Sequence, residues 1–161
     1  MKSPITNILT AITGSDASIM AAKYAIVLAK LYHCRLGVVY VVDTATIKQL
    51  TLSKIFIQAE SSEYEKSLET NGQRYLTFVE ELADAKGVKA DKILRKGAVY
   101  TEILAAADDR QADLIVMGGW EKNRSAMDII GHAHREIMLN AKCSVLLVKD
   151  PDIDQQYKQL K

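Results

Sequence analysis

Short apolar runs rich in β-branched residues recur along the chain and alternate with more polar segments. Such runs are typical of strands that are buried on both faces of a parallel sheet. The pattern predicts strands at residues 5–12, 36–42, 114–117 and 144–148, and a weaker one at residues 92–94.

Between these runs, apolar residues recur at the spacing of one helix face. The pattern predicts a first helix from Ser15, a second over about residues 62–86, a third that includes Val99 and a fourth opened by Gly131. Ser15 or Asp16 is placed to cap the first helix by accepting a free backbone N–H. The chain is therefore expected to contain four long helices among its strands.

Strand and helix alternate four times before a last strand closes the series. This order predicts an α/β fold, in which a single-domain five-stranded parallel sheet of the Rossmann-like kind carries helices on both faces. In such sheets, ligands bind beyond the carboxyl ends of the strands, where the strand order reverses. The segments expected there are residues 13–18 ("TGSDAS") and residues 116–137.

Two segments fit this alternation less well. Residues 44–61 carry apolar side chains without one clean period, so a short helix, a lid over the crevice and a partner-binding surface all stay open. Residues 150–161 begin with Asp-Pro-Asp and are largely polar. We therefore expect a mobile C-terminal tail after a domain of residues 1–149.

Composition and charge exclude several classes of function. The 21 Lys and Arg residues nearly balance 20 Asp and Glu residues, so the net charge of +1 gives no general attraction to nucleic acid or an acidic membrane. No signal peptide or membrane span is recognisable. Cys34 and Cys143 lack the spacing of a disulfide framework or zinc site, and buried free thiols are expected. These features predict a cytoplasmic protein that binds neither nucleic acid nor membrane.

Four stretches of the chain resemble the universal stress protein family: residues 7–18, 37–43, 96–119 and 131–149. The last is the most specific, because a glycine-started helix is followed by Ala141-x-Cys143 and a short apolar strand. The resemblance implies an adenine nucleotide alpha hydrolase-like fold that commonly dimerises. It also implies a family with members that bind ATP and members that do not.

Family members that bind ATP share a Gly-x2-Gly-x9-Gly-Ser/Thr motif and an Asp after the first strand. Glycines let the backbone approach the phosphates, and the N-terminus of the next helix donates free N–H groups. Here Glu121, His132 and Thr13 replace the middle glycine, the hydroxyl residue and the aspartate. The resemblance places a degenerate candidate nucleotide site at Ala11, Thr13, Val41, Met117, Gly118, Glu121, Gly131, His132 and Ala133.

The replacements predict that no cofactor is needed and that ATP or AMP binds weakly at most, since the Glu121 carboxylate repels a triphosphate. Lys122, Arg124 and His132 argue the other way, so a weak site for AMP, phosphate or another anion stays open. Trp120 lies in the same loop. The structural interpretation, in which the indole fills space that a ligand no longer occupies, is favoured over stacking on a base.

Other groups of chemically active residues predict no reaction and no metal site. His132 and His134 are two residues apart and are expected on different helix faces, so they do not share a metal. Asp16, Asp43 and Glu121 follow strands, but their spacing singles out no acid–base pair. The sequence therefore predicts that the protein is not an enzyme.

Two functions follow from the resemblance. The favoured one is a non-catalytic, dimeric stress-response protein that acts through an unknown protein partner and keeps a vestigial nucleotide crevice. The alternative is an ATP- or AMP-binding switch or slow ATPase. The last strand is expected at a sheet edge, where apolar side chains invite pairing with a second chain. This predicts a homodimer interface at Val145, Leu146, Leu147 and Val148.

Overall fold

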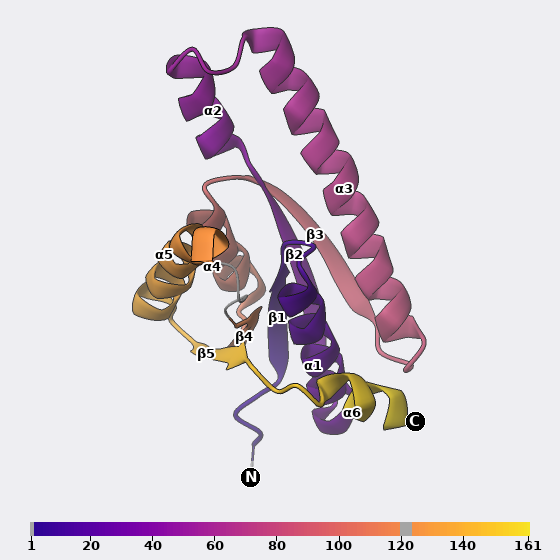
Figure 1. The fold of residues 1–161 in the computed structure, drawn as a ribbon. Helices are drawn as coiled ribbons and strands as arrows, with labels where there is room; N and C mark the ends of the chain where they lie inside the picture. The colour runs from indigo at the N-terminus through magenta and orange to yellow at the C-terminus, as the bar shows by residue number, and fades with distance from the viewer. Residues whose placement is uncertain (1, 120–123) are drawn as a thin grey trace.

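Five parallel strands form the centre of the computed structural model, which describes residues 2–119 and 124–161 (Figure 1). The strand order is β3-β2-β1-β4-β5, and every neighbouring pair is parallel. The predicted α/β fold is confirmed. The strands are β1 (Asn7–Ile12), β2 (Arg35–Asp43), β3 (Ala90–Gly97), β4 (Leu114–Gly118) and β5 (Ser144–Val148).

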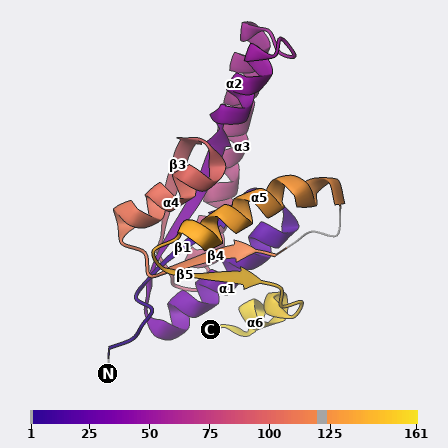
Figure 2. The ribbon, with the colours of Figure 1, turned by 90° about the vertical axis from the view of Figure 1, so that its left-hand side faces the viewer.

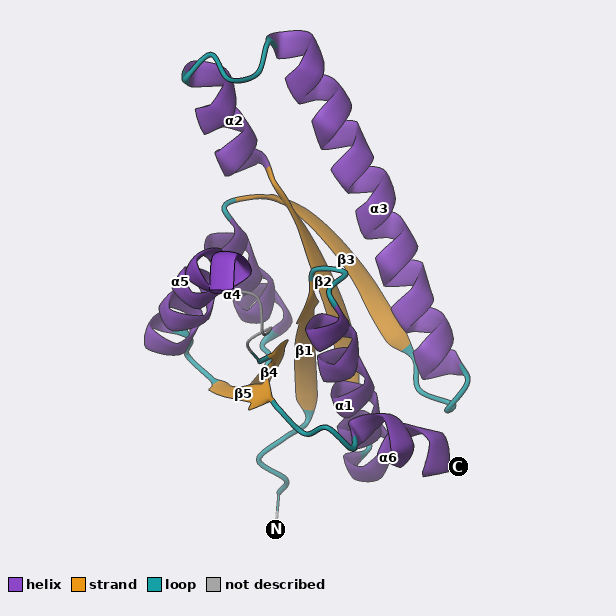
Figure 3. Cartoon of the chain, viewed as in Figure 1, coloured by secondary structure: helices purple, strands orange, loops and turns teal. Residues whose placement is uncertain are grey.

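Helices cover both faces of this sheet (Figure 3). One core cluster lies between the sheet and α1, α3 and α6, and the second lies between the sheet and α4 and α5. Both faces of the strands are therefore buried, which explains their continuous apolar runs. The helices are α1 (Asp16–Tyr32), α2 (Thr44–Leu52), α3 (Gln58–Asp84), α4 (Val99–Arg110), α5 (Arg124–Asn140) and α6 (Ile153–Gln159).

Local hydrogen bonds set both ends of α1, and the cap at its N-terminus is one that the sequence predicts. Ser15 is the N-cap, and its hydroxyl accepts from the Ser18 backbone N–H at 3.2 Å. His33 is the C-cap in the left-handed conformation, with φ 56°, and its N–H donates to the Ala29 carbonyl. The ends of α1 thus place residues 13–15 at the carboxyl end of β1.

The segment of residues 44–61 forms a short helix, α2, and the start of α3. Both project beyond the sheet as a two-helix arm (Figure 1). α2 buries only Ile47, whereas Leu52, Ile55 and Ile57 are exposed. Of the alternatives that the sequence leaves open, the short helix is therefore confirmed, and this helix borders the crevice described below.

The expectation of a mobile tail over residues 150–161 is wrong. Residues 153–159 form α6, which packs on α1. Ile153 is fully buried, and the Tyr157 hydroxyl donates to the Leu82 carbonyl at 2.6 Å. Lys23 forms an ion pair with Asp154. Two apolar residues four positions apart are enough to give this short helix a buried face.

Within the part of the chain that the structure describes, no helix combines the length and the apolar character that a membrane span requires.

Candidate functional site

A cavity of about 480 Å³ lies at the carboxyl ends of β1 and β4. Its size is that of a small-molecule site. The strand order reverses between these two strands, which is where parallel sheets of this kind bind ligands. Ala11 and Thr13 contribute from β1 and the loop after it, and Met117 and Gly118 contribute from β4. The predicted position of the crevice is confirmed.

Four other parts of the chain form the walls of this cavity. α2 and the residue before it form one wall, the beginning of α4 a second, the middle of α5 a third, and the cap and first turn of α1 a fourth. The wall residues are Ser15, Ala17, Ser18, Asp43, Ala45, Thr46, Gln49, Ala98, Val99, Tyr100, Ile103, His132, Ala133, His134 and Ile137, and Gly119 follows Gly118 at the end of β4. Most of this lining is apolar, and each of the four walls contributes polar groups.

The loop between β1 and α1 satisfies most of its own polar groups. The Thr13 backbone N–H donates to the Ser18 hydroxyl at 3.1 Å, and the Thr13 hydroxyl donates to the Ser15 hydroxyl at 3.0 Å. Gly14 has φ 86°, and Tyr75 packs so closely that an added Cβ would lie 2.3 Å from its ring. The loop is thus held in shape without any carboxylate at Thr13.

The end of β4 is fixed by close packing and by a histidine of α5. A Cβ on Gly118 would lie 2.6 Å from the Ala17 carbonyl oxygen, so a glycine is required where α1 approaches β4. The buried His134 places Nε2 2.6 Å from the Gly118 carbonyl oxygen, and this nitrogen therefore carries the donated hydrogen. The Gly119 N–H donates to the Val148 carbonyl at 2.9 Å.

The expectation that Gly131 opens a helix is wrong. α5 begins at Arg124, and Gly131 lies about two turns inside it. Glycine in a helix interior costs about 1 kcal/mol, which is too little to end a helix that its flanking residues favour. Only the first turn of a helix has unpaired N–H groups, so Gly131 and His132 do not offer them to a phosphate.

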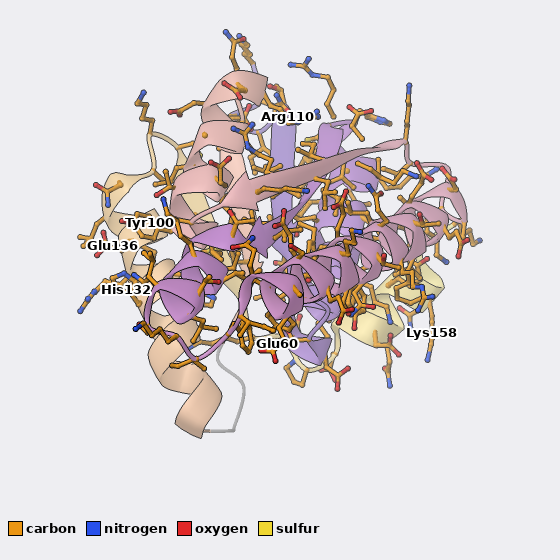
Figure 4. All side chains as sticks on the ribbon, turned by 90° about the horizontal axis from the view of Figure 1, so that it is seen from above. Glu60, Tyr100, Arg110, His132, Glu136 and Lys158 are labelled. Carbon is orange, nitrogen blue, oxygen red and sulfur yellow. The ribbon has the colours of Figure 1, made fainter. Side chains whose placement is uncertain are left out.

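Two aromatic rings meet at the rim of the cavity. Tyr100 from α4 and His132 from α5 make an edge-to-face contact with ring centroids 5.7 Å apart (Figure 4). His134 also lines the cavity, but it is engaged with the β4 end. Over the described residues, no cluster of three or more His, Cys, Asp or Glu side chains is arranged to hold a metal ion.

Asp43 is the single carboxylate among the described residues that line the cavity. It caps α2, since one oxygen accepts from the Thr46 N–H at 3.0 Å and the other from the Thr46 hydroxyl at 2.7 Å. Asp16 lies in the exposed first turn of α1 and is not part of the lining. Asp43 is therefore fixed in place as a negative charge on the cavity wall.

Six of the nine residues that the resemblance implies come together in this cavity: Ala11, Thr13, Met117, Gly118, His132 and Ala133. Val41 instead packs against the core beneath α4. Gly131 is not among the lining residues. Glu121 lies outside the described residues, as do Trp120 and Lys122, and the side chain of Arg124 is not described either.

Sequence reasoning left a role for α2 at the crevice open and missed the contribution of α4. The one available signal was Asp43 followed by Thr46, a capping pattern directly after a strand. Tyr100 and Gln49 lie on helix surfaces with no distinguishing pattern, and only the fold brings them to the cavity.

Both cysteines are only partly buried, and neither forms a disulfide. Burial raises the pKa of the Cys34 thiol and that of the Cys143 thiol, and the carboxylate of Asp113 raises both further. A raised pKa lowers the thiolate fraction, so these thiols are poor nucleophiles at neutral pH.

β5 is an edge strand, as expected, and the strand that it pairs with is β4. Val145 and Leu147 pack toward the core of α4 and α5, whereas Leu146 and Val148 pack toward the core of α1 and α3. Val148 is buried, and the other three are partly exposed. Figure 2 shows β5 as the outermost strand on this side of the sheet.

Comparison with known proteins identifies a family. The family model of the universal stress protein family matches residues 4–149. Universal stress protein MJ0531 of Methanocaldococcus jannaschii is 34% identical over 140 residues, which cover 86% of this chain and 78% of that protein.

Solved structures of the same family share the fold. A family member from Burkholderia pseudomallei superimposes with a TM-score of 0.70 at 25% identity, covering 93% of this chain and all of that one. The universal stress protein from Archaeoglobus fulgidus in complex with dAMP superimposes with a TM-score of 0.64 at 16% identity, covering 91% of this chain and 100% of that chain.

Proposed function

This chain belongs to the universal stress protein family, and we propose that it is a non-catalytic regulatory protein that does not bind ATP tightly. It acts in the cytoplasm by binding a protein partner. The observation that carries the proposal is the position of Gly131 inside α5, which removes free helix N–H groups from the place where the family motif would hold phosphate.

Two further features of the cavity support weak binding of ATP. The hydroxyl of Thr13 donates to Ser15, and Thr13 supplies no carboxylate to accept from a ribose or an adenine. Among the described lining residues, no Lys or Arg is present to pair with a phosphate. Anion binding normally relies on such cations or on free N–H groups.

Titration calorimetry with ATP and magnesium tests this proposal. We expect no saturable binding at micromolar ATP, and a low-micromolar dissociation constant, equivalent to about 8 kcal/mol, would overturn it. The matched variant combines Glu121→Gly, His132→Ser and Thr13→Asp, which restores the three groups of the family motif. Tighter ATP binding by this variant would show that those three residues cause the loss.

An AMP-binding switch is the second candidate. It is favoured by the open cavity of about 480 Å³ and by the family structure solved in complex with dAMP. Mass spectrometry of the protein as purified separates the two candidates, because co-purified adenine nucleotide supports the switch and its absence supports the first proposal.

The proposal includes a homodimer formed through β5. The support is that β5 is an edge strand and that three of its partly exposed side chains, those of Val145, Leu146 and Leu147, are apolar. Two such edges related by a two-fold axis can pair and bury these side chains, at about 25 cal/mol per Å² of apolar area. The dimer is expected to form without nucleotide.

A further inference from the structure

We infer that the arm tip, residues 52–58 at the turn between α2 and α3, inserts into the surface of an anionic lipid bilayer. The inference goes beyond the proposed function and does not depend on it. Its basis is the order of apolar, aromatic and charged side chains along the two-helix arm. The arm projects at the end of the molecule opposite the N-terminus (Figure 1).

Three large apolar side chains gather at the arm tip. Leu52 is 73% exposed, Ile55 is 65% exposed and Ile57 is 63% exposed. Single exposed apolar residues are ordinary on a protein surface, whereas a group of them indicates a contact surface. Because the arm tip projects, a soft apolar layer takes up these side chains without a matching groove.

The backbone of the arm tip is suited to a medium that lacks water. The N–H groups of residues 53–57 all donate to acceptors of the protein. Two of them, those of Ile55 and Phe56, share the Leu50 carbonyl at 3.0 and 3.2 Å. A backbone N–H without a partner is costly in an apolar layer. These hydrogen bonds therefore lower the cost of bringing the turn into a bilayer interface.

The charges nearest the arm tip are positive. Lys48 and Lys54 are the charged residues of the segment 44–59, and both are exposed. Lysines beside an inserted apolar group are attracted to anionic lipid headgroups. The acidic residues begin with Glu60 in the first turn of α3, where its carboxylate accepts from the Ile57 N–H at 3.4 Å.

The other acidic residues at the start of α3 lie closer to the sheet. Glu63 is exposed in the second turn of α3. Glu65 and Glu69 pair with Lys96 of β3 at 3.2 and 3.0 Å, so this lysine partly balances their charge. Positive charge therefore lies near the arm tip, and the carboxylates lie behind it.

An aromatic pair lies between the arm tip and the sheet. Phe56 and Tyr64 pack edge-to-face with ring centroids 5.6 Å apart, and Tyr64 is 44% exposed. Tyrosine favours the boundary between headgroups and acyl chains, because its ring is apolar and its hydroxyl is polar. Tyr64 lies about 10 Å along the helix from Ile57. This distance matches the depth of roughly 5–10 Å to which interfacial segments insert.

The inferred contact is peripheral. The expectation from sequence that the chain does not bind a membrane rests on the net charge of +1 of the whole chain. That charge does not describe the arm tip, where apolar side chains and lysines lie together. In the inferred complex the three apolar side chains enter the interface, and the sheet stays in water.

Flotation of the full chain with lipid vesicles tests the inference. Vesicles of equal parts phosphatidylcholine and phosphatidylglycerol are compared with vesicles of phosphatidylcholine alone, at low and at physiological salt. We expect binding to the anionic vesicles and weaker binding to the neutral ones. Binding to the anionic vesicles should decrease as salt is added, because salt screens the attraction of the lysines.

Substitutions separate the apolar contribution from the charged one. Ile55→Ser should lower partitioning onto both kinds of vesicle about tenfold, since one aliphatic side chain is no longer inserted. Lys54 has φ 60°, which asparagine tolerates. Lys54→Asn should lower partitioning about fivefold, and on anionic vesicles alone. Leu31→Ser is the matched control, because Leu31 is 61% exposed at the end of α1, and we expect no change.

Fluorescence quenching tests whether the arm tip itself enters the bilayer. Ile55→Trp and Leu31→Trp are compared on anionic vesicles whose lipids are brominated in the acyl chains, since bromine quenches an indole that it contacts. The unmodified protein gives the background of its one tryptophan. We expect added quenching in Ile55→Trp and none in Leu31→Trp.

Each outcome decides the inference. Flotation that Ile55→Ser weakens, together with quenching of Ile55→Trp, supports it. Absence of flotation with anionic vesicles overturns it and leaves the arm tip to the protein partner of the proposed function. Flotation that Ile55→Ser leaves unchanged, or that Leu31→Ser weakens equally, shows that another surface binds and also overturns it. Circular dichroism checks that the variants are folded, and the ATP titration tests the proposed function independently.

Discussion

The two edges of the sheet are protected in opposite ways. At the β3 edge, lysine side chains reach across to α3, where Lys92 pairs with Glu80 at 3.0 Å and Lys96 pairs with Glu65 at 3.2 Å and Glu69 at 3.0 Å. Charged side chains on an edge strand discourage another strand from pairing with it. The β3 edge is therefore blunted by the chain itself.

As far as the structure describes the β5 edge, no charged side chain of the strand protects it in this way. Val145, Leu146 and Leu147 are all apolar and partly exposed, and α6 packs on α1 and not along this strand. The difference between β3 and β5 shows that each edge strand is protected, or left open, by its own side chains. Where charge is absent, a second copy of the chain is the proposed cover.

The largest expected effect is loss of the dimer when charge is placed on β5. Leu147→Lys should convert the proposed dimer to a monomer, because a charged side chain in a paired edge would be buried without a partner. Light scattering measures the mass, and circular dichroism checks the fold. Val145→Lys and Leu146→Lys are tested separately, since these side chains pack toward opposite cores. A dimer unchanged by all three would mean that the interface lies elsewhere.

Removing charge from β3 should make this edge prone to pair with strands of other chains. Lys92→Val with Lys96→Val removes the charges that guard this strand, and we expect association beyond the dimer, seen as higher mass and as turbidity at raised concentration. The matched control is Lys48→Val with Lys66→Val, which removes two exposed lysines from α2 and α3. Equal association in both double variants would contradict a specific role for β3.

A third variant asks whether α6 serves as the cover for β5. Ile153→Ala should lower the free energy of unfolding by roughly 2–5 kcal/mol, because the side chain is fully buried. Urea unfolding measures the loss, and Gln155→Ala, at an exposed position of the same helix, is the control. The mass in light scattering should stay that of the dimer. A change of mass would link α6 to the interface.

The smallest expected effect concerns the ion pairs that hold α6. Hydrogen bonds from Lys23 and Lys158 lower the pKa of Asp154 from 3.8 to about 2. A lowered pKa stabilises the folded state above pH 3.8, and this contribution is lost as the pH falls from about 4 to 2. Asp154→Asn should flatten the dependence of the urea midpoint on pH in this window. Asp152→Asn, an exposed position on the same segment, should leave that dependence as it is.

The pattern of the sequence predicts the buried strands best and the edges of the fold least well. β5 has the predicted bounds, because its run is wholly apolar. β3 is longer than the predicted residues 92–94, since the charges that guard its edge hide its strand pattern. α6 was missed because Ile153 and Tyr157 are its two buried residues in an otherwise polar segment.

The residues of the candidate site also fall into those that the sequence predicts and those that it does not. The residues at the ends of β1 and β4 could be predicted, because a family motif marks them and strand order brings them together. Gly131 was placed wrongly, since glycine marks helix starts in the motif but does not by itself end a helix. Gln49 and Tyr100 could not be found, because only tertiary packing turns these helix positions toward the cavity.

Light scattering of the unmodified protein at micromolar concentration, without added nucleotide, tests the contrast between the two edges most directly. The account predicts a homogeneous species of twice the 17.8 kDa chain mass. A monomer of 17.8 kDa would contradict it, because the apolar β5 edge would then be stable in water without a second chain.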